Sequence, residues 1–239
     1  MVAERSTFVS TARVLGTALG ACLLVSSLAA GAASDSAATA SAAVTSSAAL
    51  QRLVEGNQRF VAGKPKHLDQ SATYRHGLTS SQHPFATILG CSDSRVPVEL
   101  LFDQGFGDLF VIRVAGNVAG TDELGSVEYA VHHLHTPLVV VLGHESCGAV
   151  TAALMTAEDQ SHEAAAIQDL LKQIQPALEG LDPKLSQAER LHRGVEANVR
   201  QTVRSLQANA DLMKPHEGAM PTIVGAVYEL ETGKVRLLK

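Results

Sequence analysis

Two short segments of the sequence carry side chains that could bind a metal ion. They are residues 91–95 (CSDSR) and residues 144–148 (HESCG). Together they offer two thiolates, an imidazole and a carboxylate, from Cys91, Cys147, His144 and Asp93. This set suits zinc, which favours tetrahedral coordination by sulfur, nitrogen and oxygen. Thiolates argue against magnesium or calcium, and an iron–sulfur cluster would need more cysteines. We therefore predict one zinc ion per chain.

The position of Asp93 would decide whether this site is catalytic. Arg95 carries a planar guanidinium that can bind a carboxylate through two hydrogen bonds. If Arg95 holds Asp93, the zinc ion keeps one position for a water, whose pKa the metal lowers toward about 7. Asp93 can then accept the hydrogen of the zinc-bound hydroxide. If Asp93 binds zinc instead, the site is closed, so the Asp93–Arg95 pair is expected to act as a gate.

Each of these residues also has a simpler interpretation. His144 alone could be a buried or capping histidine, and Cys147 alone a small buried hydrophobic residue. In an oxidising compartment Cys91 and Cys147 could form a disulfide. The placement of both segments at the ends of apolar runs favours the zinc site over these alternatives.

Short apolar runs indicate the strands that position the two segments. They cover residues 85–90, 109–114, 138–143 and 222–228. Continuous runs of Val, Ile and Leu are typical of strands covered on both faces, as in a parallel sheet. Two of the runs end directly at Cys91 and His144, and the carboxyl ends of parallel strands meet at one edge of a sheet. The two metal-binding segments should therefore lie together.

Helical stretches separate the apolar runs, which predicts an α/β fold. We expect helices over residues 47–61, stopped by Gly63 and Pro65, over 121–135 with Thr121 as the cap, and over 163–180 and 186–213. A tight turn over residues 231–234 should lead into a short antiparallel edge strand over 235–238. The predicted architecture is a mostly parallel four-stranded sheet with that edge strand, flanked by helices.

Composition limits the classes of function. The chain has 239 residues, of which 46% are hydrophobic and 18% charged, so it can form a sizeable core and is not disordered as a whole. Its net charge is −5, and it has no run of Lys and Arg, which argues against binding to nucleic acid. Aromatic residues make up 4% and tryptophan is absent, so a stacking platform for bases or sugars is not expected.

The first 46 residues differ in composition from the rest. Two arginines precede the uncharged stretch 14–34, and small residues end it, which predicts a signal peptide over residues 1–32. Residues 33–46 are rich in Ala, Ser and Thr and are expected to form a linker before the domain at 47–239. The protein should be periplasmic or extracellular, without stable membrane insertion after cleavage. Alternatives are a retained membrane anchor, a lipoprotein acylated at Cys22, or a wrongly assigned start codon.

The two metal-binding segments resemble those of the β-class carbonic anhydrases. The resemblance extends over about residues 48–239 and includes residues 113–117 (RVAGN), 125–130 (GSVEYA) and 225–228 (GAVY). It implies reversible hydration of carbon dioxide to bicarbonate and a proton. It also implies zinc bound by Cys91, His144 and Cys147, the Asp93–Arg95 gate, and a homodimer or tetramer with the active site at the subunit interface.

The family has two types of site, and the resemblance favours the open type. The regulated type has a tryptophan shortly before the first zinc cysteine, where this chain has Ile88. The open type has a glutamine, a phenylalanine and a tyrosine at positions that match Gln82, Phe110 and Tyr129. Gln82 would donate an amide N–H to a substrate oxygen, and the two rings would line an apolar slot for a small nonpolar gas. Without the motifs, core packing would be the simpler interpretation of both rings.

Two further positions belong to the expected substrate slot, Gly148 and Ala115. Plant-like members have a valine at the position of Ala115, so the slot could be looser here. The group His132, His133 and His135 could include a proton shuttle, although solvated or dimer-contact histidines are the simpler interpretation.

Two other functions are compatible with the same residues. Some relatives hydrolyse carbon disulfide or carbonyl sulfide on this scaffold, but the sequence has no extended tail that such a change could use. A non-catalytic module could keep zinc as a structural ion. The pairing of Asp93 with Arg95 argues against this module, because a structural site needs no competing arginine.

Overall fold

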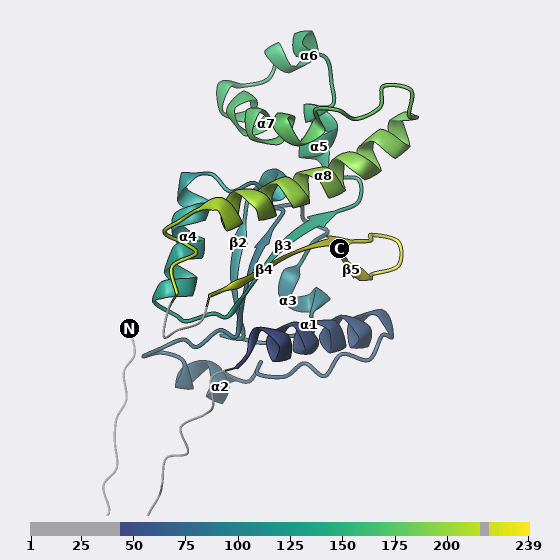
Figure 1. The fold of residues 1–239 in the computed structure, drawn as a ribbon. Coiled ribbons are helices and arrows are strands. Elements are labelled where there is room, and N and C mark those ends of the chain that lie inside the picture. The colour runs from purple at the N-terminus through teal and green to yellow at the C-terminus, as the bar shows by residue number, and fades with distance from the viewer. Residues whose placement is uncertain (1–43, 216–219) are drawn as a thin grey trace, which may run out of the picture. The chain divides into compact units, whose positions relative to one another are not determined.

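The computed structural model describes residues 44–215 and 220–239 (Figure 1). A five-stranded sheet has the order β2-β1-β3-β4-β5. Its first four strands are parallel and comprise β1 (Ala86–Gly90), β2 (Leu109–Arg113), β3 (Leu138–His144) and β4 (Thr222–Tyr228). The short β5 (Val235–Leu237) runs antiparallel to β4. The predicted α/β fold is therefore confirmed.

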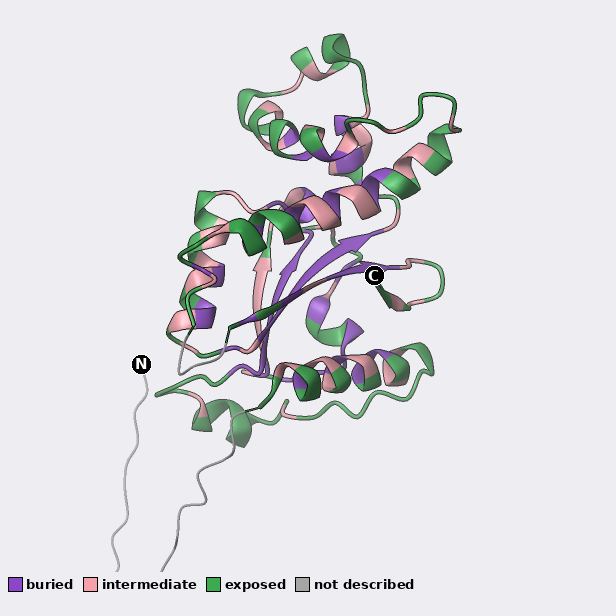
Figure 2. Ribbon diagram, in the orientation of Figure 1, coloured by how far each residue is buried: buried purple, intermediate pink, exposed green. Residues whose placement is uncertain are grey.

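Helices cover both faces of the sheet. On one face lie α1 (Ser46–Val61) and α3 (Val98–Leu101), and on the other lie α4 (Thr121–His132) and α8 (Gln187–Ala208). The remaining helices are α2 (Ala72–Gly77), the 3₁₀ turn η1 (Ala115–Asn117), α5 (Gly148–Ala153), α6 (Ala157–Ser161) and α7 (Ala165–Leu178). Strands β1 and β3 are buried along their whole length (Figure 2), which explains their unbroken apolar sequences.

The alternation of side chains across the sheet divides the core in two. Leu89 and Val141 point into the layer under α8, whereas Ile88 and Val140 point into the layer under α1. All four side chains are at most 1% exposed. The central strands are thereby fixed from both faces, and so are the residues that follow their carboxyl ends.

Several helix boundaries differ from the sequence prediction. Helix α1 begins at Ser46, one residue before the expected start of the domain, because the Thr45 side chain accepts a hydrogen bond from the backbone N–H of Ala48. Thr121 was expected to cap α4, but Gly120 is the cap and Thr121 is the first helical residue. This helix also ends at His132 rather than near His135.

The long helix α8 starts where the sequence predicts and ends early. Ser186 and Glu189 form a capping box at its beginning. The helix stops at Ala208 instead of reaching residue 213, because the Asn209 side chain accepts a hydrogen bond from the backbone of Leu212 and stabilises a turn there. The expected signal peptide and residues 33–43 of the linker lie outside the described residues.

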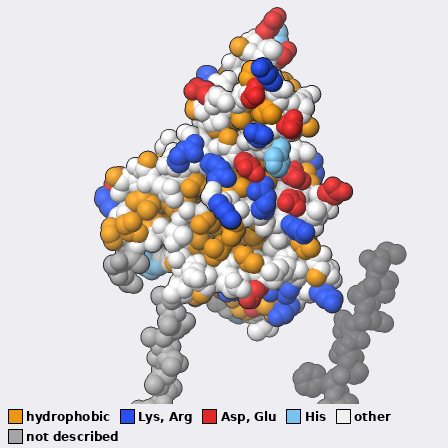
Figure 3. Space-filling model, turned by 45° about the vertical axis from the view of Figure 1, so that its right-hand side comes forward, with side chains coloured by type: hydrophobic (Ala, Val, Ile, Leu, Met, Phe, Trp, Pro, Cys, Tyr) orange, Lys and Arg blue, Asp and Glu red, His pale blue; other side chains and the backbone are white. Residues whose placement is uncertain are grey.

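Hydrophobic side chains gather on one face of the molecule, with Lys and Arg side chains beside them (Figure 3). A groove of about 470 Å³ runs between α1 and β5, lined by Leu50, Val54 and Val61 of the helix and by Val235 and Leu237 of the strand. None of the predicted metal ligands lines this groove.

Asn57 joins the C-terminal strand to the body of the domain, which gives a test of the fold. Its amide donates to the carbonyls of Leu101 and Gly233 and accepts from the backbone N–H of Val235, over 2.9–3.0 Å. We expect Asn57→Leu to lower the free energy of unfolding by about 2–4 kcal/mol, because it leaves these backbone groups without a partner. Denaturant unfolding measures this loss. The neighbouring exposed residue supplies the control, Gln58→Ala, and an equal effect of both changes would contradict the assignment.

Candidate metal centre

The carboxyl ends of two adjacent strands form the centre. In the sheet register, Gly90 of β1 pairs with Leu142 of β3, so Cys91 lies beside the residues that end β3. The turn after β3 then brings Cys147 to the same place, at the start of α5. The sulfur atoms of Cys91 and Cys147 and a ring nitrogen of His144 all lie within 4.8 Å of one another. The structure therefore brings together the three residues predicted to bind zinc.

The two cysteines are close, but they are not a disulfide. Their sulfur atoms are 4.0 Å apart, about twice the length of an S–S bond, and both residues are free. Both are buried, at 4% and 1% exposure. The disulfide alternative is therefore not the arrangement in this structure.

The orientation of His144 fits a metal ligand. Its Nδ1 is 2.8 Å from the backbone carbonyl of Glu145, which can only accept, so the ring proton sits on Nδ1. Its Nε2 then carries a lone pair and is completely buried without a hydrogen-bond partner among the described residues. Burying such a group is unfavourable unless something binds it. This orphaned nitrogen faces the two sulfur atoms, so the residues fit a zinc ion.

The two thiols differ in their affinity for a proton. A hydrogen bond with Cys147 lowers the pKa of Cys91, despite the opposing effect of burial, and a hydrogen bond from the backbone N–H of Gly116 contributes. The same hydrogen bond, together with burial, raises the pKa of Cys147. Without a metal the pair would share one proton at neutral pH. A divalent cation would displace that proton, since metal binding requires both thiolates.

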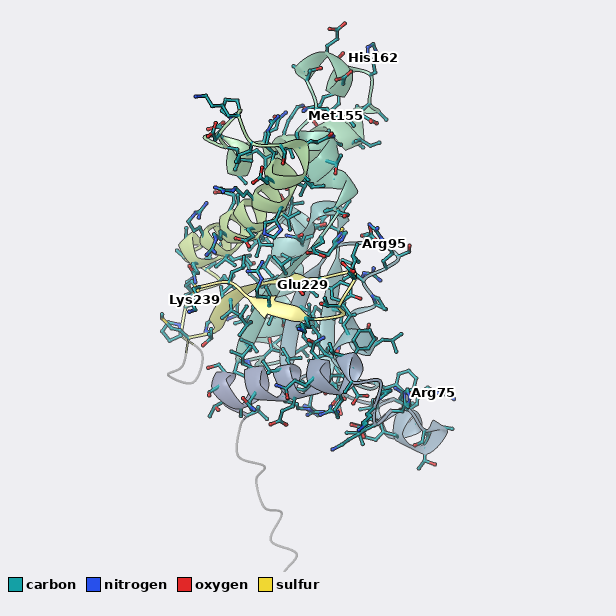
Figure 4. All side chains as sticks on the ribbon, turned by 90° about the vertical axis from the view of Figure 1, so that its right-hand side faces the viewer. Arg75, Arg95, Met155, His162, Glu229 and Lys239 are labelled. Atoms are coloured by element: carbon teal, nitrogen blue, oxygen red, sulfur yellow. The ribbon has the colours of Figure 1, made fainter. Side chains whose placement is uncertain are left out.

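Asp93 is paired with Arg95 and lies next to the cluster. The Nε and Nη2 atoms of Arg95, which is labelled in Figure 4, donate to the two carboxylate oxygens of Asp93 over 2.9 and 2.8 Å. These hydrogen bonds hold the pKa of Asp93 well below its usual range, so the carboxylate stays ionised at neutral pH. Its Oδ2 is 3.8 Å from His144 Nε2. The carboxylate therefore lies next to the position that a fourth metal ligand would take, and Arg95 holds the carboxylate away from that position.

Arginine side chains also hold the backbone around the cluster, which the sequence reasoning did not anticipate. Arg95 Nη2 donates to the carbonyl of Ser146, and so connects the two metal-binding segments over 3.2 Å. Arg113, the last residue of β2, donates to the carbonyls of Cys91 and Asp93 over 3.0 and 2.6 Å. The only sequence signal was the position of Arg113 at the end of an apolar run, which places it at the same edge of the sheet.

Two of the predicted substrate residues lie beside the cluster. Ala115 in η1 and Gly148 at the start of α5 line one cavity of about 380 Å³. Ala152 of α5 and Ile167 and Leu170 of α7 complete much of its apolar wall. Gly148 directly follows Cys147, so this cavity lies close to the cluster, although none of the three clustered residues lines it.

The other predicted substrate residues lie elsewhere in the same chain. Phe110 pairs with Thr87 in the sheet, four residues before Cys91 and thus about 13 Å from it along the strand. Its ring is 6.2 Å from that of Tyr129, which is 47% exposed. Gln82 is exposed and precedes β1, so it lies at the end of the sheet opposite the cluster. The predicted substrate residues therefore form two separate groups within one chain.

The histidines of α4 lie with the second group. His133 packs against the Tyr129 ring at 5.1 Å, and His132 Nε2 is 3.1 Å from the carbonyl of Asp211. The C-terminal end of α4 leads to the start of β3, whereas the cluster follows the end of β3. These side chains are therefore not near the cluster of their own chain. Ile88 is fully buried in the core.

Comparisons with known proteins agree with this geometry. The family model described as carbonic anhydrase matches residues 86–235. Carbonic anhydrase 2 of Mycobacterium tuberculosis is 44% identical over 192 residues, covering 80% of this chain and 91% of the relative. The carbonic anhydrase of Mycolicibacterium smegmatis is 42% identical over 192 residues, with 80% and 92% covered.

Solved structures of β-carbonic anhydrases have a similar fold. The enzyme of Coccomyxa, solved in complex with acetazolamide, has a TM-score of 0.65 at 27% identity and covers 79% of this chain and 86% of its own. That of Aspergillus fumigatus has a TM-score of 0.62 at 27% identity, with 81% and 90% covered.

Substitution of one sulfur ligand tests the metal site. We expect Cys147→Ser to reduce the zinc content from about one ion per chain to a small fraction of that, and to lower thermal stability, because metal binding is coupled to folding. Metal analysis of the purified variant measures the first effect and calorimetry the second. Ser92→Ala, at an exposed position of the first segment, is the control. Full zinc retention in Cys147→Ser would remove this residue from the ligand set.

Proposed function

The chain belongs to the β-class carbonic anhydrase family, and from this we propose that it catalyses the reversible hydration of carbon dioxide to bicarbonate and a proton. Curated relatives at 42–44% identity carry the name carbonic anhydrase. The observation that carries the proposal is the buried Nε2 of His144, which has no hydrogen-bond partner in the described part of the chain. It faces two cysteine sulfurs beside a carboxylate that an arginine holds. Cys91, His144 and Cys147 would hold zinc as three ligands and leave a fourth position.

The chain's own residues would organise the reaction around that position. Zinc, when bound, supplies a Lewis acid that makes water acidic near neutral pH. Asp93, held by Arg95, is placed to accept a hydrogen bond from the attacking oxygen and to orient its lone pair toward the carbon dioxide. The apolar cavity at Ala115 and Gly148 would receive this nonpolar substrate. Because the pKa of Asp93 is strongly lowered, the carboxylate would remain an acceptor throughout the neutral range.

The same pair would gate the site. Two hydrogen bonds from the Arg95 side chain retain the Asp93 carboxylate, and a third comes from the Arg95 backbone N–H. The carboxylate is only 3.8 Å from a proposed ligand nitrogen, so loss of the guanidinium would leave it free to bind the metal and displace water. A constitutively open site requires the pair to persist at neutral pH.

Stopped-flow measurement of carbon dioxide hydration between pH 6.5 and 9 tests both parts, with zinc quantified on the same samples. We expect rapid hydration by the wild-type protein with about one zinc per chain. Arg95→Ala should keep its zinc but lose about ten-fold or more of its rate at neutral pH, because Asp93 can close the site. Arg75→Ala removes an equal charge from the exposed α2 and serves as the control.

The outcomes separate the proposals. A zinc-loaded wild-type protein without hydration activity at any pH in that range would overturn the anhydrase proposal and leave carbon disulfide or carbonyl sulfide hydrolysis, or a structural zinc, to be examined. Full activity of Arg95→Ala at neutral pH would instead contradict only the gate.

A homodimer would unite the two groups of substrate residues. Strand β2 is the edge of the sheet, and its sequence LFVIR is apolar except for Arg113, yet all its residues are half-buried or exposed. Such an apolar edge strand is a typical surface for association. Gln82, Phe110 and Tyr129 lie far from the cluster of their own chain. We propose that a second copy brings them to the cavity at Ala115 and Gly148.

Mixed dimers test whether the site is shared between copies. Cys147→Ser and Gln82→Ala should each have little activity alone. If both variants are refolded together in equal amounts, half of the dimers contain one chain of each kind. Each such dimer has one intact site, with its zinc ligands from one chain and Gln82 from the other. Roughly a quarter of the wild-type activity should therefore return. No recovery, with mixed dimers demonstrated by distinct affinity tags, would mean that Gln82 does not act across the interface.

We also propose that the protein is exported and acts in the periplasm or outside the cell. Support comes from the sequence of residues 1–32 alone, with its positive start, uncharged stretch and small-residue end. Among the described residues, no helix has the length and apolar character to cross a membrane. N-terminal sequencing of the protein recovered from the periplasm or culture medium tests this proposal, and a sequence starting at Met1 would contradict it.

A further inference from the structure

A polar residue lies inside the apolar face of α8. Asn198 is 1% exposed, and its helix neighbours Val195 and Val199 are both part of the hydrophobic core. Its amide nitrogen donates to the backbone carbonyl of Gly116 over 2.7 Å. Its amide oxygen is buried without a hydrogen-bond partner among the described residues. A half-satisfied buried amide contributes little or nothing to stability, so its hydrogen bond to Gly116 calls for another explanation.

Gly116 connects Asn198 to a proposed zinc ligand. Its backbone N–H donates to Cys91 Sγ over 3.3 Å. It has the left-handed backbone conformation, with φ 71° and ψ 13°. A Cβ atom here would lie 2.7 Å from Ile174 Cδ1 and 3.2 Å from Ala149 Cβ, so the position needs glycine for both conformation and space. Because glycine is the most flexible residue, the direction of its N–H depends on what holds its neighbouring groups.

We propose that Asn198 is a positioning residue for the metal ligand Cys91. By holding the carbonyl of Gly116, it keeps the adjacent N–H directed at the Cys91 sulfur. That hydrogen bond draws electron density from the thiolate, which weakens the sulfur's donation to a bound metal and leaves the metal a stronger Lewis acid. Asn198, 82 residues after Gly116 in the chain, would thus act on Cys91 through the backbone of Gly116. The inference rests on the zinc site of the proposed function.

The geometry argues for this role over simple packing. The neighbouring Asn117 has φ 45° and its side-chain nitrogen is also buried without a partner among the described residues. The turn η1 thus contains two consecutive residues in the left-handed region, and the Asn198 side chain donates to the carbonyl between them. Without this contact, η1 can relax and turn the Gly116 N–H away from the sulfur, although the apolar packing of α8 remains.

Cobalt substitution gives a readout on the sulfur itself. The full-length protein is loaded with Co²⁺, and the sulfur-to-cobalt charge-transfer absorption is recorded for wild type, Asn198→Ala, Asn198→Asp and Thr202→Val. Thr202 is a buried polar residue one turn further on α8, at 4% exposure, so Thr202→Val controls for a general change in the core of this helix. We expect the charge-transfer band to shift to longer wavelength in both Asn198 variants, because a thiolate without its hydrogen bond is easier to oxidise.

Activity and unfolding complete the test. The zinc forms of the Asn198 variants should have about ten-fold lower kcat/KM near neutral pH, as is typical when a group supporting a metal ligand is removed. Thr202→Val should match the wild type in both band position and kcat/KM. If the buried charge of Asn198→Asp prevents folding, Asn198→Ala decides the question by itself. Thermal unfolding shows whether a variant loses activity only because it is less stable.

Each result has one meaning. A band in Asn198→Ala at the wild-type wavelength, or a shift equalled by Thr202→Val, would overturn the positioning role. A wild-type protein that binds neither zinc nor cobalt would overturn the proposed metal site itself, which is a different failure. A shifted band with unchanged kcat/KM would contradict the link between the sulfur's hydrogen bond and catalysis.

Discussion

The pairing of β1 with β3 is the constraint on which the site depends. The two strands are parallel neighbours in register, so both end at the same edge of the sheet. Cys91 follows one end, and His144 forms the other. Cores on both faces hold these strands, and all their residues are buried. A shift of either strand by one residue would reverse the direction of every side chain. The positions of Cys91 and His144 are therefore set by two strands that are buried along their whole length.

Around this cluster, hydrogen bonds from neighbouring backbone and arginine groups hold the side chains and loops in place. The Glu145 carbonyl fixes the ring of His144, and the Gly116 N–H approaches Cys91. Arg95 holds the Asp93 carboxylate, while Arg113 donates to the backbone carbonyls of Cys91 and Asp93. The Asp93 carboxylate is 3.8 Å from His144 Nε2, so under the proposed gate it would compete reversibly for the metal whenever Arg95 released it.

The separation of the substrate residues has a consequence for assembly. The cavity at Ala115 and Gly148 lies beside the cluster, while half-buried Phe110 of the edge strand β2 and exposed Tyr129 of α4 form an aromatic pair. One chain cannot bring the aromatic pair to the cavity, because the two lie at different positions along the same sheet. Association through the apolar edge would complete the pocket and remove apolar surface from water at once. Catalysis and oligomerisation would then depend on the same residues.

The sequence by itself predicted the order of the strands, the longer helices, the clustering of Cys91, His144 and Cys147, and the family. Buried parallel strands leave unbroken apolar runs, and the ligands directly follow two of them, so local patterns sufficed. Helix ends were less certain: Thr121 was expected as a cap, but Gly120 takes that position, since either residue can adopt the required backbone. Only the tertiary structure decided that Arg113 donates to the carbonyl of Cys91 and that Asn198 donates to the carbonyl of Gly116. It also decided that Gln82, Phe110 and Tyr129 lie far from Cys91. Such contacts join residues that are distant in the chain. The sequence around a single asparagine in a helix, or around an aromatic residue in a strand, does not indicate which distant residue it will contact.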